Sequence, residues 1–144
     1  METSMMRHLR LAAESGDAAA QFNLGVLYNS RLDDNGYAIE SNQAEAIKWL
    51  LAAAEQGLPH AQSKLAELYA DGTKRSENYV NACAWFLLAT TTARGIHRHH
   101  ARSGYERVAA RLTPAQLTKA KRLAGGWQAR GRRETPQLGE EKTQ

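Results

Sequence analysis

The chain has 144 residues, a formal net charge of +4 and a hydrophobic content of 42%, which is enough to form a core and excludes wholesale disorder. Its single cysteine, Cys83, excludes an internal disulfide framework, and no stretch approaches the roughly 20 apolar residues that span a bilayer. Residues 1–16 hold no apolar run long enough for a signal peptide, so the sequence predicts a cytoplasmic protein without a transmembrane segment.

Two stretches of the chain repeat each other, and this repetition organises the rest of the sequence. At an offset of 41 residues, five spaced positions are identical, and they pair Ala20, Gln21, Leu24, Leu27 and Tyr28 with Ala61, Gln62, Leu65, Leu68 and Tyr69. At an offset of 36 residues, a further set pairs Asn42, Ala46, Trp49 and Ala53 with Asn78, Ala82, Trp85 and Ala89. The difference of five residues predicts an insertion in the loop 29–41, and units of this length are typical of helical repeat arrays.

Residues 1–16 precede the first complete unit. The offset of 41 residues aligns Met5 and Met6 with the start of a second helix of a hairpin, so we predict an N-terminal half-repeat helix. It is either a simple cap, because terminal repeats are usually atypical, or an open end that docks another chain. A weak homodimer through Met5, Met6 and Leu9 is one form of the second alternative.

Each repeat unit is predicted to form an antiparallel helical hairpin, the first over residues 17–57 and the second over residues 58–95. The first helices of the hairpins, Ala18–Ser30 and Pro59–Asp71, carry apolar residues at i, i+4, i+7 and i+8, which is the stripe of a helix with one buried face. Because a lone hairpin cannot bury this face, neighbouring hairpins are expected to stack into a solenoid.

The second helices of the hairpins are predicted at about Gln43–Gln56 and Tyr79–Ala93. Asn42 and Asn78 stand where a side-chain oxygen caps the free N–H groups at a helix start. Glycines fall just after the predicted helix ends, where left-handed backbone favours them; they are Gly16, Gly57, Gly72 and Gly95.

The pattern Ala-x-x-x-Leu-Gly-x-x-Tyr from Ala20 to Tyr28, followed by Ala-x-x-Trp and Ala-Ala-Glu-x-Gly, resembles the Sel1-like repeat of the tetratricopeptide-like proteins. The resemblance covers about residues 5–127 and departs from the family at Ala66, where glycine is favoured. It implies an all-α, right-handed α-solenoid of antiparallel hairpins with about seven helices. It also implies a non-enzymatic scaffold or adaptor, often bacterial, that binds a protein or peptide partner.

The repeat pattern fades after the second unit, and residues 96–129 are predicted to be a C-terminal capping pair of helices. The first of them is expected at about His97–Leu112. The second opens with the sequence Thr-Pro-Ala-Gln, in which Thr113 caps the helix and Gln116 reaches back to it. Residues 130–144 contain one large apolar residue and are predicted to be a disordered tail.

Helical solenoids usually bind partners in the concave groove lined by their first helices. The side chains predicted to face away from the core there are Gln21, Asn23, Asn29, Ser63, Lys64 and Glu67. Phe22 and Val26 are apolar where the second unit has Ser63 and Glu67. They either cover the N-terminal helix or form a small apolar anchor for a partner, and we favour packing.

Basic residues gather in the C-terminal part of the chain. Residues 1–93 carry 7 Lys/Arg and 11 Asp/Glu, whereas residues 94–144 carry 12 and 4. The arginines follow a helical spacing at Arg94, Arg98 and Arg102 and again at Arg107 and Arg111. Such a basic stripe can neutralise phosphates, so binding of nucleic acid or of an anionic surface is the alternative to a protein partner. Base stacking requires exposed aromatic side chains, of which few lie nearby, so we favour the protein partner.

Candidate catalytic and metal-binding residues are few. His97, His99 and His100 cluster at the start of a predicted helix, but Glu106 is the nearby carboxylate and the cysteine lies in another helix, so a zinc site is not expected. Cys83 has no adjoining base that would activate its thiol. No phosphate loop, catalytic triad or pair of carboxylates is recognisable, and the sequence therefore predicts no catalytic residue, cofactor or metal.

Overall fold

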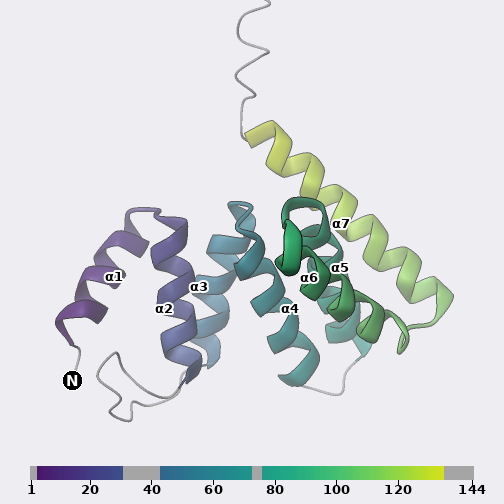
Figure 1. Cartoon of the computed structure of the whole chain (residues 1–144), viewed down its shortest axis with the longest axis horizontal. Coiled ribbons are helices and arrows are strands. Elements are labelled where there is room, and N and C mark those ends of the chain that lie inside the picture. The colour runs from purple at the N-terminus through teal and green to yellow at the C-terminus, as the bar shows by residue number, and fades with distance from the viewer. Residues whose placement is uncertain (1–2, 31–42, 73–75, 135–144) are drawn as a thin grey trace, which may run out of the picture.

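The structure is a computed structural model that describes residues 3–30, 43–72 and 76–134. Within these residues it contains seven helices and no strand, which confirms the predicted all-α solenoid (Figure 1). The helices are α1 (Ser4–Glu14), α2 (Ala18–Ser30), α3 (Gln43–Glu55), α4 (Pro59–Gly72), α5 (Ser76–Thr92), α6 (Gly95–Ala109) and α7 (Pro114–Glu134).

The helices follow one another along the longest axis of the molecule as antiparallel hairpins (Figure 1). In the two repeat units α2 packs against α3 and α4 packs against α5, and the contact of α3 with α4 joins the units. α1 packs against α2 in the place of a preceding second helix. The turns that enter α2, α4 and α6 all lie at the same edge of the molecule, so these three first helices begin side by side (Figure 1).

The turns that enter α2 and α4 are built alike. Gly16 and Gly57 have φ angles of 104° and 94°, in the left-handed region where an L side chain is strained. In each turn the next backbone N–H donates to a carbonyl five residues earlier, from Asp17 to Ala12 and from Leu58 to Ala53. The predicted glycine turns are therefore confirmed at both positions, and they fix the direction of the following helix.

Glycines let neighbouring helices approach closely at two places in the core. A Cβ atom on Gly25 of α2 would lie 2.7 Å from Cγ of Leu50 and 3.1 Å from the backbone oxygen of Ala46. A Cβ atom on Gly104 of α6 would lie 2.6 Å from Cζ of Phe86, which is fully buried. No side chain fits at either position unless the neighbouring helix moves.

A buried glutamine ties each hairpin to the helix before it. Nε2 of this glutamine donates to a carbonyl in the last turn of the preceding helix, 3.1 Å away in both units, from Gln21 to Ala13 and from Gln62 to Ala54. Its side-chain oxygen accepts a hydrogen bond from the C-terminal end of its own hairpin, at 2.9 Å from Gln56 to Gln21 and at 3.3 Å from Thr92 to Gln62. These two sets of residues are hereafter the glutamine locks.

The glutamine locks correct one sequence prediction. Gln21 was expected to face a partner on the surface, and this is wrong, because its side chain is only 6% exposed. The carbonyl groups in the last turn of a helix have no partner within that helix, and a buried one must be satisfied from elsewhere. Gln21 supplies that partner to Ala13, so its role is structural.

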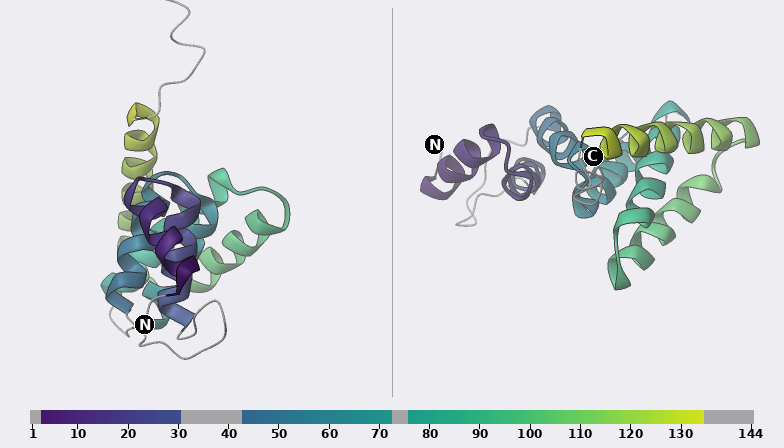
Figure 2. Two further views of the ribbon diagram at one scale, coloured as in Figure 1. Left: turned by 90° about the vertical axis from the view of Figure 1, so that its left-hand side faces the viewer. Right: turned by 90° about the horizontal axis from the view of Figure 1, so that it is seen from above.

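The two C-terminal helices, α6 and α7, both pack against α5, the last helix of the second repeat unit. Figure 2 shows α6 and α7 diverging from their shared end. The reason lies in α5, which presents apolar side chains on two faces. Phe86 meets α6 at Gly104, whereas the ring of Trp85 stacks on that of Trp127 in α7, with centroids 4.2 Å apart at an angle of 24°.

α7 begins as predicted and ends later than predicted. The backbone N–H of Thr113 donates to Oε1 of Gln116 at 2.9 Å, and the N–H of Gln116 donates to Oγ1 of Thr113 at 3.2 Å, which is a capping box. The helix then continues to Glu134, into the segment predicted to be a disordered tail from residue 130. Residues 135–144 of that segment lie outside the described part of the chain.

The structure differs from the prediction at the starts of α5 and α6. Asn78 does not begin α5 as its cap, because that helix already starts at Ser76 and includes Asn78. Asn42 and residues 31–41 of the predicted insertion lie outside the described residues. α6 starts at Gly95, two residues before the predicted position.

α1 places only part of its apolar surface in the core. Met6 and Ala13 are buried, whereas Met5 and Leu11 are each 54% exposed. At about 100° per residue, Met5 and Leu11 point roughly 120° apart, so they do not form one continuous patch. The surface predicted for a homodimer loses Met6, because that side chain is buried within the same chain.

Candidate functional site

A groove of about 150 Å³ crosses the starts of the first helices of successive hairpins. α2 contributes one side chain, α4 contributes most of the wall, and the start of α6 closes the far side. The lining residues are Phe22, Pro59, His60, Ser63, Lys64, Glu67, Ala93, His97 and His100. This surface is hereafter the histidine groove.

Three aromatic rings form a row across the histidine groove, one from each helix. The rings of Phe22 and His60 meet edge to face, with centroids 6.3 Å apart at 60°. The rings of His60 and His97 are closer, with centroids 4.2 Å apart at 64°. Phe22 is half-buried and both histidines are exposed, so the two imidazoles are available to a ligand in the groove. The row exists only because the repeats stack, and no local sequence motif encodes it.

Glu67 contacts two basic side chains in the histidine groove. Its Oε2 lies 3.7 Å from Nζ of Lys64 on the same helix, and its Oε1 lies 3.0 Å from Nε2 of His100 on α6. The contact with His100 becomes an ion pair only when the imidazole is protonated. Partly exposed ion pairs contribute about 0–1 kcal/mol, so the main effect of these contacts is to hold Glu67 in place and to offset its charge.

Half of the predicted partner-binding residues lie in the histidine groove. Phe22, Ser63, Lys64 and Glu67 line it. Gln21 is buried in a glutamine lock, and Asn23, Val26 and Asn29 lie elsewhere on α2. Phe22 packs against the main core that α3, α4 and α5 share and not over α1, so the expectation that it covers the N-terminal helix is wrong.

The histidines of the groove were not predicted as partner-binding residues. His97 and His100 were considered only as metal ligands, and His60 was not considered. A signal for them is present in the sequence, because the offset of 36 residues also aligns His100 with Lys64 and His97 with Ala61. Extending the repeat comparison into α6 would have placed both side chains beside α4.

The five arginines of the predicted basic stripe are all exposed but do not form one surface. Arg102 lies 3.5 Å from Glu106 in an ion pair, and Arg111 donates to the hydroxyl of Tyr79 at 3.2 Å. The step from Arg102 to Arg107 is five residues, which turns the helix by about 140°. Arg98 and Arg102 therefore share a face of α6 and Arg107 faces elsewhere, while Arg94 precedes the helix and Arg111 follows it.

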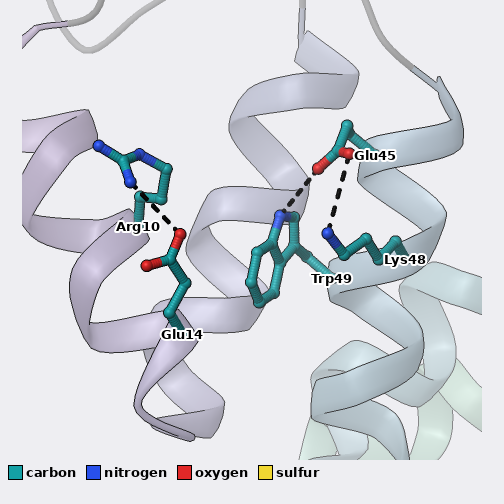
Figure 3. A network of polar contacts seen from close by, with 5 residues as sticks. All are labelled: Arg10, Glu14, Glu45, Lys48 and Trp49. Carbon is teal, nitrogen blue, oxygen red and sulfur yellow. Dashed lines mark hydrogen bonds and ion pairs between the residues drawn. The ribbon is translucent and has the colours of Figure 1, made fainter.

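A second polar cluster lies on the other helices of the N-terminal hairpins (Figure 3). Nε1 of Trp49 donates to Oε2 of Glu45 at 3.1 Å, and Nζ of Lys48 lies 4.8 Å from the centroid of the Trp49 ring. On α1, Arg10 lies 3.3 Å from Glu14. The indole N–H is already bonded within its own helix, and the ring packs against the small core that includes Leu24, so Trp49 has a structural role.

Cys83 is fully buried in α5. Burial raises the pKa of its thiol to about 11, against a smaller opposing effect of Lys121. Because the thiolate is the reactive form, we expect the folded protein to react with a disulfide reagent at least about 100-fold more slowly than the unfolded protein at neutral pH. Mass spectrometry of timed samples measures the two rates. Equal rates would show that Cys83 is accessible in the folded state.

Neither a metal-binding cluster nor a membrane-spanning helix occurs among the described residues. Residues 3–30, 43–72 and 76–134 contain no group of three or more His, Cys, Asp or Glu side chains arranged to hold a metal ion. None of the seven helices in this part of the chain is both long enough and apolar enough to cross a membrane.

Both repeat units match a known protein family. Residues 18–58 and residues 59–91 each match the family model described as the Sel1 repeat. An F-box protein of Arabidopsis thaliana is 44% identical over 57 residues, which are 40% of this chain and 14% of that protein. The chitin synthase regulator SKT5 of Saccharomyces cerevisiae is 32% identical over 106 residues, which are 72% of this chain and 15% of that protein. The chain thus spans only about a seventh of the length of these two relatives.

Solved structures show the same architecture. A protective antigen of uropathogenic Escherichia coli strains, described as having an SLR fold, superposes with a TM-score of 0.72 and 31% identity, over 92% of this chain and 28% of the antigen. A Sel1 repeat protein from Oxalobacter formigenes superposes with a TM-score of 0.53 and 30% identity, over 87% of this chain and all of that chain.

Proposed function

The chain belongs to the Sel1 repeat family, and on that premise we propose that it is a non-enzymatic protein-interaction module that binds a protein or peptide partner in the histidine groove. One observation carries the proposal. Side chains from three successive first helices meet in one concave surface that offers an aromatic ring, imidazoles and charged groups together. Concave surfaces of this kind are the usual binding sites of helical solenoids.

The remaining surface supports this choice of site. The exposed arginines along α6 do not share one helix face, which argues against a continuous basic track for a nucleic acid. The segment similar to this chain occupies about a seventh of a chitin synthase regulator, so a module of this size serves there as one part of a larger protein. We accordingly propose that this chain provides a binding surface for its partner and that chemistry, where needed, belongs to the partner.

Reversing one charge in the histidine groove tests the proposed function. Lys64 is partly exposed and faces the groove, so Lys64→Glu should repel a partner whose acidic groups contact this lysine, while leaving the helices intact. Lys119→Glu makes the same charge change on the exposed surface of α7 and is the matched control. Partners captured from native cell extract are quantified by mass spectrometry, with a circular dichroism spectrum for each variant.

We expect wild type and Lys119→Glu to retain the same set of proteins and Lys64→Glu to lose at least about tenfold in the amount of the main partner, a change of about 1.4 kcal/mol in binding free energy. If Lys64→Glu retains that set in full, the partner does not bind in the histidine groove and the proposed function at this site is wrong.

A further inference from the structure

The charge of the histidine groove depends on three histidines. Among the described residues, its lining contains one lysine and one glutamate, Lys64 and Glu67, and these two charges cancel. α2 carries no charged side chain between Ala18 and Ser30, and α3 and α5 contribute no lining residue. His60, His97 and His100 can add up to three positive charges, and an imidazole changes its charge between roughly pH 5 and pH 8.

The arrangement of the imidazoles favours an anionic ligand when they are protonated. His60 and His97 have ring centroids 4.2 Å apart, so two imidazolium ions at this distance repel each other unless an anion lies between or beside them. The protonated form of His100 is already offset by Glu67 at 3.0 Å. α4 and α6 both begin at the groove, and the partial positive charge at the N-terminus of each helix also favours an anion there.

Apolar side chains in and beside the groove favour a peptide as the source of that anion. Phe22 lies at one end of the row of rings and is half-buried. Ile96 does not line the groove, but it directly precedes His97 in the sequence and is 77% exposed, which is high for a large apolar side chain. Arg94, directly before α6, and Arg98, within α6, are both exposed and add to the positive charge near His97.

We propose that the histidine groove binds an acidic segment of a protein partner, and that protonation of His60, His97 and His100 sets the affinity. This inference rests on the proposed function and adds the chemistry of the partner and its dependence on pH. Carboxylates of the partner lie against the imidazoles and Lys64, and apolar side chains of the same segment contact Phe22 and Ile96. Affinity rises as the pH falls from about 7.5 to about 5.5, because free carboxylates stay ionised over this range whereas added positive charge on the groove attracts them.

The test uses the full chain and short fluorescein-labelled peptides of defined composition. One peptide contains glutamate and leucine, a second contains glutamine and leucine, and the third probe is a labelled oligothymidine. Fluorescence anisotropy gives the dissociation constants at about pH 5.5 and about pH 7.5, on either side of the range in which histidine titrates. The test variant is His60→Gln/His97→Gln/His100→Gln. His99→Gln, an exposed histidine of α6 outside the groove, is the matched control.

We expect the glutamate peptide to bind at least about tenfold more tightly at the lower pH to wild type and to His99→Gln, and this dependence on pH to vanish in the triple variant. A glutamate peptide that does not bind, or that binds equally at both pH values, overturns the inference. So does a dependence on pH that persists in the triple variant, or tighter binding of the oligothymidine than of the peptide.

The glutamine peptide separates the two proposals. If it binds as tightly as the glutamate peptide and Lys64→Glu weakens both, the groove is a peptide site without preference for acidic segments. The inference then fails while the proposed function stands. The capture experiment with Lys64→Glu decides the proposed function independently of any synthetic peptide.

Discussion

Replacing Trp85 with alanine is expected to lower the free energy of unfolding by about 3–5 kcal/mol, as for other buried aromatic side chains. The Trp85 side chain is 5% exposed, and its ring stacks on Trp127 with centroids 4.2 Å apart. The substitution removes apolar contacts of α5. It also removes the stack with Trp127, which among the described residues is the only ring stack between α5 and α7. A typical domain has about 5–15 kcal/mol in reserve, so the variant should be close to unfolding. Urea denaturation followed by far-ultraviolet circular dichroism measures the loss.

The partner ring gives the control for this prediction. Trp127→Ala should cost less, because Trp127 is only partly buried, and the double variant should cost less than the sum of the single variants since both remove the same stack. Additive losses would show that the two rings do not interact in solution. A melting temperature of Trp85→Ala within a degree or two of wild type would place Trp85 on the surface and refute the repeat register.

Replacing Gly104 with valine is expected to lower the free energy of unfolding by about 1–3 kcal/mol through overpacking. A Cβ atom at this position would lie 2.6 Å from Cζ of Phe86, whose ring is fully buried. The valine side chain therefore forces α6 away from α5. Because His97 and His100 belong to α6, the same variant should also weaken binding in the histidine groove.

Gly126 of α7 is the matched control for Gly104. A Cβ atom there meets nothing within 4 Å, so Gly126→Ala should leave the packing unchanged. Glycine within a helix is less favourable than alanine by about 0.5–1 kcal/mol, and we expect this variant to be slightly more stable than wild type. Urea denaturation compares the two variants directly. If Gly104→Val is as stable as wild type, α6 does not pack on Phe86 as described.

Most of the fold could be predicted because it follows from short-range patterns that occur twice. The apolar stripe of α2 predicted its bounds correctly, and the glycines at positions 16 and 57 predicted the turns. Gln21 shows where this reasoning fails. Its identity with Gln62 was visible in the sequence, but a polar residue was interpreted as a surface residue. Only the position of the preceding helix reveals that its amide satisfies a buried carbonyl.

The C-terminal helices and the site depend on contacts that no single repeat contains. α5 has apolar residues on two sides, and the sequence predicts two C-terminal helices without showing which side of α5 each of them contacts. The histidine groove combines one ring from each of three helices, and successive ring residues lie more than 35 positions apart in the sequence. The lining residues on α2 and α4 were predicted in part. Those on α6 could not be predicted without knowing that α6 lies beside α4.

The glutamine locks determine where this protein can change in length without consequence. Both locks lie near the edge at which α2 and α4 begin, and both make the same glutamine-to-carbonyl hydrogen bond, although the first unit is five residues longer than the second between aligned positions. That difference falls between Ser30 and Gln43, beyond the far end of α2. Surface segments that leave the framework intact accept insertions readily. Foreign epitopes or recognition loops grafted at this junction would leave the geometry of the opposite edge untouched, which makes the hairpin ends a natural place for family members to diversify.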